Sequence, residues 1–215
     1  MNIERLVNTE TDQNCYIVYD NEKEGIIIDP GSSADIIFDK VKELGIMIKY
    51  ILLTHCHYDH IEGLDLLRKL TGAKVGASFE CNLGIQNPKI NVSFMFGNPI
   101  KEAPAELILN DNDIIKAGNM EIKTITTPGH TKGGVCYLID EDLFSGDTLF
   151  LRSIGRTDLP GGDFNSIKKS ITQKLYTLDD EIIVHPGHGN DTKIYYEKQY
   201  NTYINIKYFV NNFAF

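Results

Sequence analysis

Short apolar runs alternate with stretches of helical periodicity along the first half of the chain. The runs are rich in β-branched and aromatic residues, which predicts strands at residues 3–9, 14–20, 25–28, 48–53 and 73–77. Residues 33–44 and the segment from Ile61 to about Gly72 repeat apolar side chains three or four positions apart, which predicts helices. Because strands alternate with helices, a layered α/β fold is expected.

Strands dominate the second half of the chain, and helical segments follow them. The predicted strands are residues 106–109, 119–126, 134–139, 142–144 and 182–184. A helix begins at Asp163 or Asn165 and continues through Leu178, and a second one covers residues 193–201. No linker or low-complexity segment divides the sequence, so one domain over residues 1–215 is the simplest interpretation.

Residues 84–105 interrupt both patterns. Three proline-containing turns break any regular element, and residues 94–96 add two phenylalanines and a methionine. A long irregular loop inside a folded domain is often a lid or a binding loop. An ordinary surface excursion is the alternative, and the sequence leaves the role of this loop open.

Composition and charge narrow the classes of function. Hydrophobic residues make up 42% of the 215 positions and charged residues 24%, as in soluble globular proteins. The net charge of −9 argues against binding to nucleic acid, which requires basic patches. The four cysteines lie far apart, which favours reduced thiols, and neither a secretory signal nor an apolar run of about 20 residues is present. A cytoplasmic protein without a membrane span is predicted.

The densest chemistry lies in residues 54–60, between an apolar run and the second predicted helix. In an extended segment His55 and His57 point to the same side, so they can share one metal ion, whereas Cys56 points away. Asp59 and His60 lie where the chain turns into its helix, so their side chains point elsewhere and suit a second metal position beside the first. Imidazole and carboxylate are ligands of borderline divalent metals. The alternative is a group of surface histidines beside a helix-capping aspartate.

Three later turns repeat this logic. His130, Asp147 and His188 each follow a predicted strand and lie beside glycine, which lets the backbone approach a site closely. Five of the six histidines thus occupy such turns, and His185 is interpreted as a structural histidine. Arg156 and Asp158 are expected to pair with each other or with the loop that bears the site.

The pattern His55-x-His57-x-Asp59-His60, followed by His130, Asp147 and His188, resembles the metallo-β-lactamase fold superfamily. Residues 144–150, 155–163 and 186–189 more narrowly resemble glyoxalase II-like hydrolases, of which the short single-domain bacterial members are most similar. The resemblance implies a four-layer αββα sandwich of the α/β (α+β) class, with metals at one edge between the two sheets.

The resemblance also implies two divalent metal ions, with zinc expected and iron or manganese as alternatives. His55, His57 and His130 would hold one ion, and Asp59, His60 and His188 the other, while Asp147 would bridge them. The implied reaction is hydroxyacylglutathione hydrolase-like: a metal-bound hydroxide attacks a small ester or thioester, and Asp59 orients it as the catalytic residue. Two cations lower the pKa of a shared water molecule and so hold it as hydroxide, and a thiolate, whose thiol has a pKa of ~8.5, leaves without much help.

Other functions remain open at this stage. A persulfide dioxygenase would use a single iron held by His55, His130 and Asp147. A nuclease of the same fold is opposed by the negative charge, and a non-enzymatic metal-stabilised protein is opposed by the intact Asp59. The physiological substrate is left open. An aromatic C-terminal tail is a candidate surface for homo-oligomer formation, and its residues are Tyr203, Tyr208, Phe209, Phe213 and Phe215.

Overall fold

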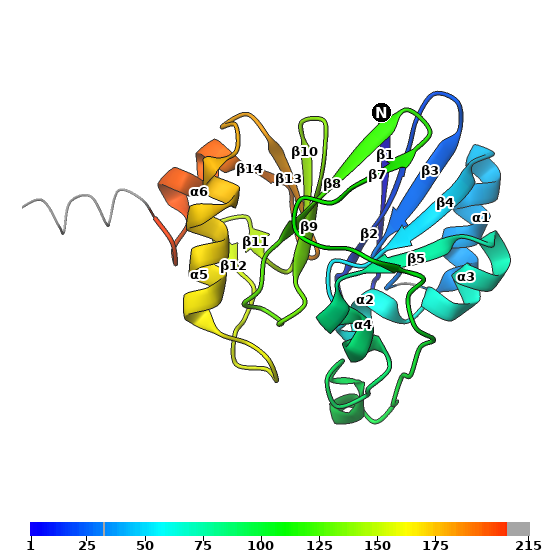
Figure 1. Cartoon of the computed structure of the whole chain (residues 1–215), viewed down its shortest axis with the longest axis horizontal. Helices are drawn as coiled ribbons and strands as arrows, with labels where there is room; N and C mark the ends of the chain where they lie inside the picture. The colour runs from blue at the N-terminus through cyan, green and yellow to red at the C-terminus, as the bar shows by residue number, and fades with distance from the viewer. Residues whose placement is uncertain (32, 206–215) are drawn as a thin grey trace, which may run out of the picture.

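Two six-stranded sheets face each other in the protein, and helices cover their outer faces (Figure 1). The structure is a computed structural model that describes residues 1–31 and 33–205. Within that part, Tyr203 is 58% exposed. The other tail aromatics lie outside the described residues, so a subunit interface there stays a prediction; they are Tyr208, Phe209, Phe213 and Phe215.

The first sheet follows the chain order from β1 to β6. Its strands are β1 (Asn2–Val7), β2 (Asn14–Tyr19), β3 (Glu24–Ile28), β4 (Met47–Leu52), β5 (Lys74–Ala77) and β6 (Leu107–Ile108). The first three strands pair antiparallel, whereas β3 to β6 are parallel. Parallel strands need crossover connections, and α1 (Ala34–Leu44) and α3 (Leu64–Thr71) lie in two of these, on the outer side of the sheet (Figure 1).

The second sheet has the order β14-β13-β10-β9-β8-β7. Its strands are β7 (Ile114–Ala117), β8 (Met120–Thr126), β9 (Val135–Ile139), β10 (Asp142–Gly146), β13 (Ile183–Pro186) and β14 (Thr192–Lys193). β10 and β13 pair in parallel, whereas the other neighbours in this order pair antiparallel, so the carboxyl ends of β10 and β13 lie side by side. The helices α5 (Phe164–Gln173) and α6 (Ile194–Tyr200) cover the outer face, and β11 (Leu149–Phe150) pairs with β12 (Ser153–Ile154).

Three layers of apolar side chains hold the sheets and helices together. Strand alternation divides β3 between two of these layers: Ile27 faces the helices, whereas Ile26 and Ile28 enter the core between the sheets. A third layer, which includes Ile167 and Ile171, lies between the second sheet and α5. Strands that are buried on both faces must be apolar throughout, which explains the uninterrupted apolar runs. The predicted αββα sandwich is confirmed.

Several predicted boundaries were wrong. The helix after the histidines is divided into α2 (Tyr58–Ile61) and α3, because the Gly63 amide donates to Pro30 O at 2.9 Å instead of continuing the helix. The helix expected to reach Leu178 ends at Gln173 and is followed by the 3₁₀ helix η2 (Leu175–Thr177). Residues 84–105 are less irregular than expected, since they contain the end of α4 (Phe79–Ile85) and the 3₁₀ helix η1 (Ser93–Phe96). Among the helices of the described chain, none combines the length and apolar character that crossing a membrane requires.

Leu53 connects β4 to the histidine loop, and a substitution at this position tests how much its packing stabilises the fold. Its side chain is fully buried in the layer that faces the helices. We expect Leu53→Ala to lower the free energy of unfolding by about 2–5 kcal/mol, because the cavity is lined by groups that cannot collapse freely. Urea denaturation measures the change. Leu66→Ala, at a side chain that is 46% exposed, is the matched control, and equal losses in the two variants would contradict this assignment.

Candidate metal centre

The seven residues singled out in the sequence converge at one edge of the sandwich. His55 and His57 follow β4, His130 follows β8, Asp147 follows β10 and His188 follows β13. Asp59 and His60 join them from α2. The strand ends that bear these residues belong to both sheets, so the site forms only when the two sheets pack against each other.

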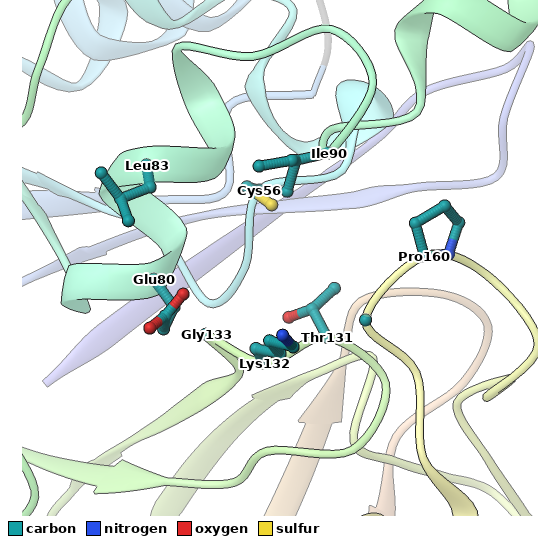
Figure 2. Close-up of a pocket in the computed structure, with 9 residues that line it drawn as sticks. Cys56, Glu80, Leu83, Ile90, Thr131, Lys132, Gly133 and Pro160 are labelled. Carbon is teal, nitrogen blue, oxygen red and sulfur yellow. The ribbon is translucent and has the colours of Figure 1, made fainter.

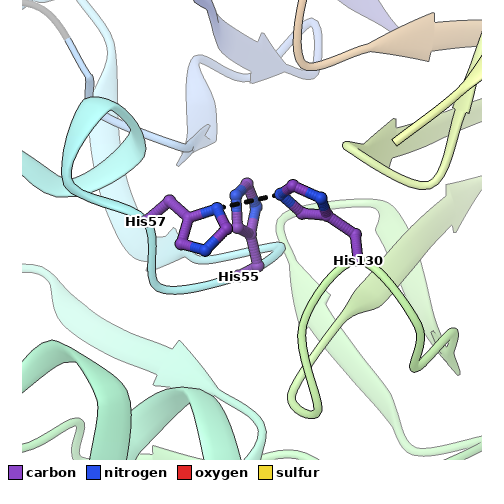
Figure 3. A group of neighbouring side chains, drawn as sticks. All are labelled: His55, His57 and His130. Carbon is purple, nitrogen blue, oxygen red and sulfur yellow. Dashed lines mark hydrogen bonds between the residues drawn. The ribbon is translucent and has the colours of Figure 1, made fainter. Parts of the chain in front are cut away.

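Three histidines form the first group of donor atoms. Donor atoms of His55, His57 and His130 all lie within 4.8 Å of one another, and the three residues are buried. Nδ1 of His57 faces Nε2 of His130 at 2.9 Å, and Figure 3 shows the ring of His55 between the rings of these two residues. Within the described residues, Nε2 of His55 has no hydrogen-bond partner although it is buried. Buried ring nitrogens without partners are unfavourable unless a cation binds them.

Asp59, His60 and His188 form the second group. Asp59 Oδ2 lies 3.3 Å from His188 Nε2 and 3.9 Å from His60 Nε2, and the two Nε2 atoms are 3.3 Å apart. A competing group of three, Asp29 with His55 and His60, is also compact enough to hold an ion.

Asp147 lies between the two groups and contacts both. Its Oδ1 is 3.4 Å from His60 Nε2, whereas its Oδ2 is 3.5 Å from His130 Nε2 and 3.7 Å from His188 Nε2. Two donors that each lie about 2.0–2.1 Å from one tetrahedral ion are about 3.3–3.4 Å apart. Most of the observed separations are close to that value. The donor set therefore fits two neighbouring divalent ions.

Burial and neighbouring charges shift the ionisation of the histidines and of Asp147 in the group in different directions. Burial and the neighbouring His130 lower the pKa of His57 to about 3, and burial together with His60 lowers that of His55, so both imidazoles are neutral. Burial alone would raise the pKa of Asp147, but His60 and His130 outweigh it and hold the pKa well below its usual range. Burial would lower the pKa of His60, but the carboxylates of Asp147, Asp29 and Asp59 raise it well above the ordinary value.

A sequence profile of the metallo-beta-lactamase superfamily matches residues 8–188. The chain belongs to this superfamily. It is 36% identical over 211 residues to the hydroxyacylglutathione hydrolase GloC of Haemophilus influenzae, with 96% of this chain and 100% of that protein covered. Among solved structures, the B3 metallo-beta-lactamase BLEG-1 has a TM-score of 0.90 at 34% identity, covering 94% of this chain and 99% of that one. TTHA1623 in a di-iron-bound form has a TM-score of 0.83 at 27% identity, covering 94% and 100%.

Asp29 also belongs to the site, although the sequence alone did not indicate it. It is 1% exposed, and its carboxylate accepts from the Thr54 amide at 2.7 Å and the Thr54 hydroxyl at 2.5 Å. The same carboxylate lies 2.9 Å from Nδ1 of His60, which fixes the orientation of that ring. Asp29 lies in an Asp-Pro-Gly turn, so its letters indicated only a turn.

Glycine and the remaining candidates behave as their positions predicted. A Cβ atom at Gly187 would lie 2.3 Å from Asp147 Oδ1, so only glycine lets this turn approach the site. Cys56 is buried, and a Cβ atom added at Gly84 would meet its sulfur at 2.3 Å, which confirms packing against α4. His185 is buried, with Nε2 at 2.7 Å from Asp142 Oδ1.

The loop at residues 156–158 contributes a backbone contact to the site. His130 Nδ1 lies 2.7 Å from Arg156 O, which orients this ring from outside the donor group. The Arg156 guanidinium donates to both carboxylate oxygens of Asp158 at 2.7 Å each, so these side chains pair with each other as one of the two sequence interpretations proposed.

The segment 84–105 packs beside the site. The ring of Phe96 lies 4.6 Å from that of Tyr58, the residue that follows His57. Farther along, the Glu102 amide donates to Ile85 O at 2.9 Å, and its side chain is buried. Burial, with Asp65 nearby, raises the pKa of Glu102 from 4.5 to about 8.

Asp29→Asn tests whether the carboxylate beside His60 supports metal binding. The amide keeps the size of the side chain but removes the charge that holds the ring, so we expect the affinity for zinc to fall about 10- to 100-fold. Competition with a chelator measures this affinity. Asp20→Asn is the control. Asp20 is also buried, but its carboxylate accepts hydrogen bonds from the amides of Asn119 and Glu24, away from the site. Unchanged affinity in Asp29→Asn would refute the assignment.

Glu102 gives the fold a dependence on pH. An acid with a raised pKa holds its proton more tightly when folded, so its contribution to stability is complete below pH 4.5 and is lost as the pH rises towards 8. In Glu102→Gln this loss should disappear, and the variant should lose less stability than the wild type over that interval. Urea denaturation at several pH values, with the exposed Glu22→Gln as control, measures the difference. Parallel pH profiles of wild type and Glu102→Gln would contradict the expectation.

Proposed function

We propose that this protein is a metal-dependent hydrolase of small thioesters, with hydroxyacylglutathione-type thioesters as the sharpest form of the proposal. The observation that carries it is the position of Asp147, whose carboxylate lies within 3.4–3.7 Å of donors from both groups. The likeness to the GloC protein of Haemophilus influenzae, over nearly the whole of this chain, supports the choice of substrate class.

The residues would divide the work as follows. His55, His57 and His130 would hold one divalent ion, Asp59, His60 and His188 the other, and Asp147 both. Zinc is the expected metal, with iron or manganese as alternatives. When bound, two such ions lower the pKa of water to near neutrality and polarise a carbonyl oxygen.

Asp59 is proposed as the catalytic residue. Burial would raise its pKa, but His60 and His188 outweigh it and lower the pKa, so the carboxylate is ionised at neutral pH. An ionised carboxylate accepts hydrogen bonds only, and it can therefore fix the orientation of the attacking water. Its place on α2, one residue before the fully buried His60, restricts its motion.

Among the candidate substrates, thioesters do not require the protein to protonate the leaving group. The thiol of a thioester leaving group has a pKa of ~8.5, so the thiolate departs without a proton from the protein, whereas the nitrogen of an amide or β-lactam must be protonated. The likeness to a B3 metallo-beta-lactamase makes a β-lactam the natural competing substrate in any assay. A nuclease is disfavoured by the net charge of −9, as the sequence already indicated.

A single-iron dioxygenase remains the alternative in another reaction class. It would need only His55, His130 and Asp147, and those residues do converge. The second group, with His188 and Asp59 at 3.3 Å, supplies donors that this alternative leaves without a function. Hydrolysis uses them all. A cytoplasmic location is part of the proposal, and the four free, buried cysteines are compatible with it.

Elemental analysis and activity on S-lactoylglutathione test this proposal together. We expect up to two metal ions per chain and hydrolysis that is lost on metal removal and restored by zinc. In His57→Ala and Asp59→Ala, kcat/KM should fall about 100-fold or more, since these side chains hold and orient the reacting groups. Asp35→Asn, on the exposed side of α1, is the control.

The same assay includes a generic thioester, a β-lactam and oxygen consumption with glutathione persulfide. Full activity of the metal-free protein would exclude the mechanism. A single iron with oxygen consumption, or turnover of the β-lactam alone, would replace the proposed function with one of its competitors.

A further inference from the structure

His188 is held differently from the other donors of the second group. Its side chain is 27% exposed, whereas that of Asp59 is 17% exposed and that of His60 is fully buried. Asp29 orients His60 at Nδ1, but among the described residues no hydrogen bond reaches Nδ1 of His188. The position of the His188 ring therefore depends mainly on the backbone turn that carries it.

Asn14, at the start of β2 in the first sheet, binds three carbonyl oxygens of this turn. Its side-chain nitrogen Nδ2 donates to Pro186 O at 3.0 Å and to Gly189 O at 2.9 Å, and its backbone amide donates to Gly187 O at 2.7 Å. The residue is 1% exposed. Because these oxygens precede and follow His188 in the chain, one residue of the first sheet holds the turn on both sides of the donor.

The contacts of the Asn14 side chain require a group that donates twice. Both of its partners are carbonyl oxygens, which only accept hydrogen bonds. An ionised aspartate has about the same size but cannot donate, and serine has a single hydroxyl proton. Without the amide, Gly189 O would lose this bond, whereas Pro186 O would keep the one that it accepts from the Tyr16 hydroxyl at 2.7 Å.

Gln13, the residue before Asn14, links the turn to the support of His60. Gln13 is fully buried, and its Nε2 donates to Asn14 O at 2.8 Å and to Asp29 O at 3.0 Å. Its backbone also forms an isolated antiparallel bridge with His188. The supports of His60 and His188 are thus joined, and the Nε2 atoms of these two donors lie 3.3 Å apart.

The first donor group has supports of its own. Thr54 O, just before the histidines, accepts a hydrogen bond from the Val135 amide at 2.8 Å. Cys56, between the two histidines of the loop, packs against α4 and lies beside Ile90 (Figure 2). Within the described part of the chain, no hydrogen bond joins residues 13–14 to a donor of this group. A change in the Asn14 side chain should therefore act on one group of donors and not on the other.

We propose that Asn14 is a positioning residue for the second metal position. Its side chain sets the affinity for that ion through the turn of His188 and leaves the first position unchanged. Donor atoms hold an ion well only within about 0.5 Å of the productive geometry, and the two hydrogen bonds from Nδ2 keep the turn within that range. This inference rests on the proposed function, because it needs an ion in the group formed by Asp59, His60 and His188.

A purely structural role of Asn14 predicts a different result. A buried asparagine that joins two segments stabilises the fold wherever it lies, and its loss does not distinguish between two ions. Asn201 provides the comparison, since it is also 1% exposed. Its Nδ2 donates to Ser153 O at 3.0 Å and to Glu197 Oε2 at 2.8 Å, and neither partner is a candidate metal donor.

Zinc binding to the metal-free protein tests the proposal without turnover. Competition with a chelator should resolve two binding steps in the wild type, and the step that disappears in His188→Ala reports the second position. In Asn14→Ala this step should weaken about 10- to 100-fold, whereas the other step should change by less than about threefold. Asn14→Ser, which keeps one donor, should shift the same step by a smaller factor, and it provides the test where Asn14→Ala does not fold.

The matched control is Asn201→Ala, which should lose stability to urea as Asn14→Ala does but keep both zinc-binding steps. Equal weakening of the two steps in Asn14→Ala would overturn the proposal, because it would indicate a general loss of structure. An unchanged second step in Asn14→Ala, or the same selective shift in Asn201→Ala, would also overturn it.

The outcome can be separated from that of the proposed function. If Asn14→Ala weakens only the second step but the wild type hydrolyses no thioester, the positioning role stands and the reaction is wrong. If the wild type hydrolyses S-lactoylglutathione with two bound ions and Asn14→Ala binds both as tightly, the hydrolase stands and the role of Asn14 is wrong. A single binding step in the wild type would overturn this inference.

Discussion

The carboxylate of Asp147, whose side chain is 12% exposed, is the constraint on which the rest of the site depends. An ionised carboxylate inside a protein is unfavourable unless positive charge lies beside it. Without a metal, His60 must supply that charge, and three carboxylates raise its pKa accordingly. Divalent cations supply it more fully, and the imidazoles around Asp147 then act as neutral ligands. Metal binding and stability of this edge of the sandwich are therefore coupled, because the same charges that would hold the metals repel one another in its absence.

Because of this coupling, the donor side chains must be held in fixed positions by the residues around them. Donors come from the ends of β4, β8, β10 and β13, so the two sheets must be packed before the donors meet. Asp29 holds His60 from one side, and the backbone oxygen of Arg156 holds His130 from the other. Gly187 leaves the space that Asp147 occupies. The hydrogen bond from the Ser78 hydroxyl to Gly133 O also joins a turn of one sheet to a turn of the other.

Much of this arrangement could be predicted from the sequence, and the remainder could not for definite physical reasons. Apolar runs such as those of β2 and β3 predict strands that are buried on both faces, as the structure has them. Short strands such as β11, β12 and β14 have two residues each, too few for any periodicity. The seven candidate donors were recognisable because four of them lie within residues 55–60 and the other three lie beside glycine in turns that follow strands. Asp29 was not, because an aspartate before Pro-Gly is an ordinary turn residue.

The most direct test of the two-metal site is anomalous X-ray scattering from crystals of the zinc-loaded protein at the metal absorption edge. The account predicts two neighbouring peaks, one among His55, His57 and His130 and one among Asp59, His60 and His188, with Asp147 in contact with both. A single peak within the competing group formed by Asp29, His55 and His60, or no peak at this edge of the sandwich, would contradict it.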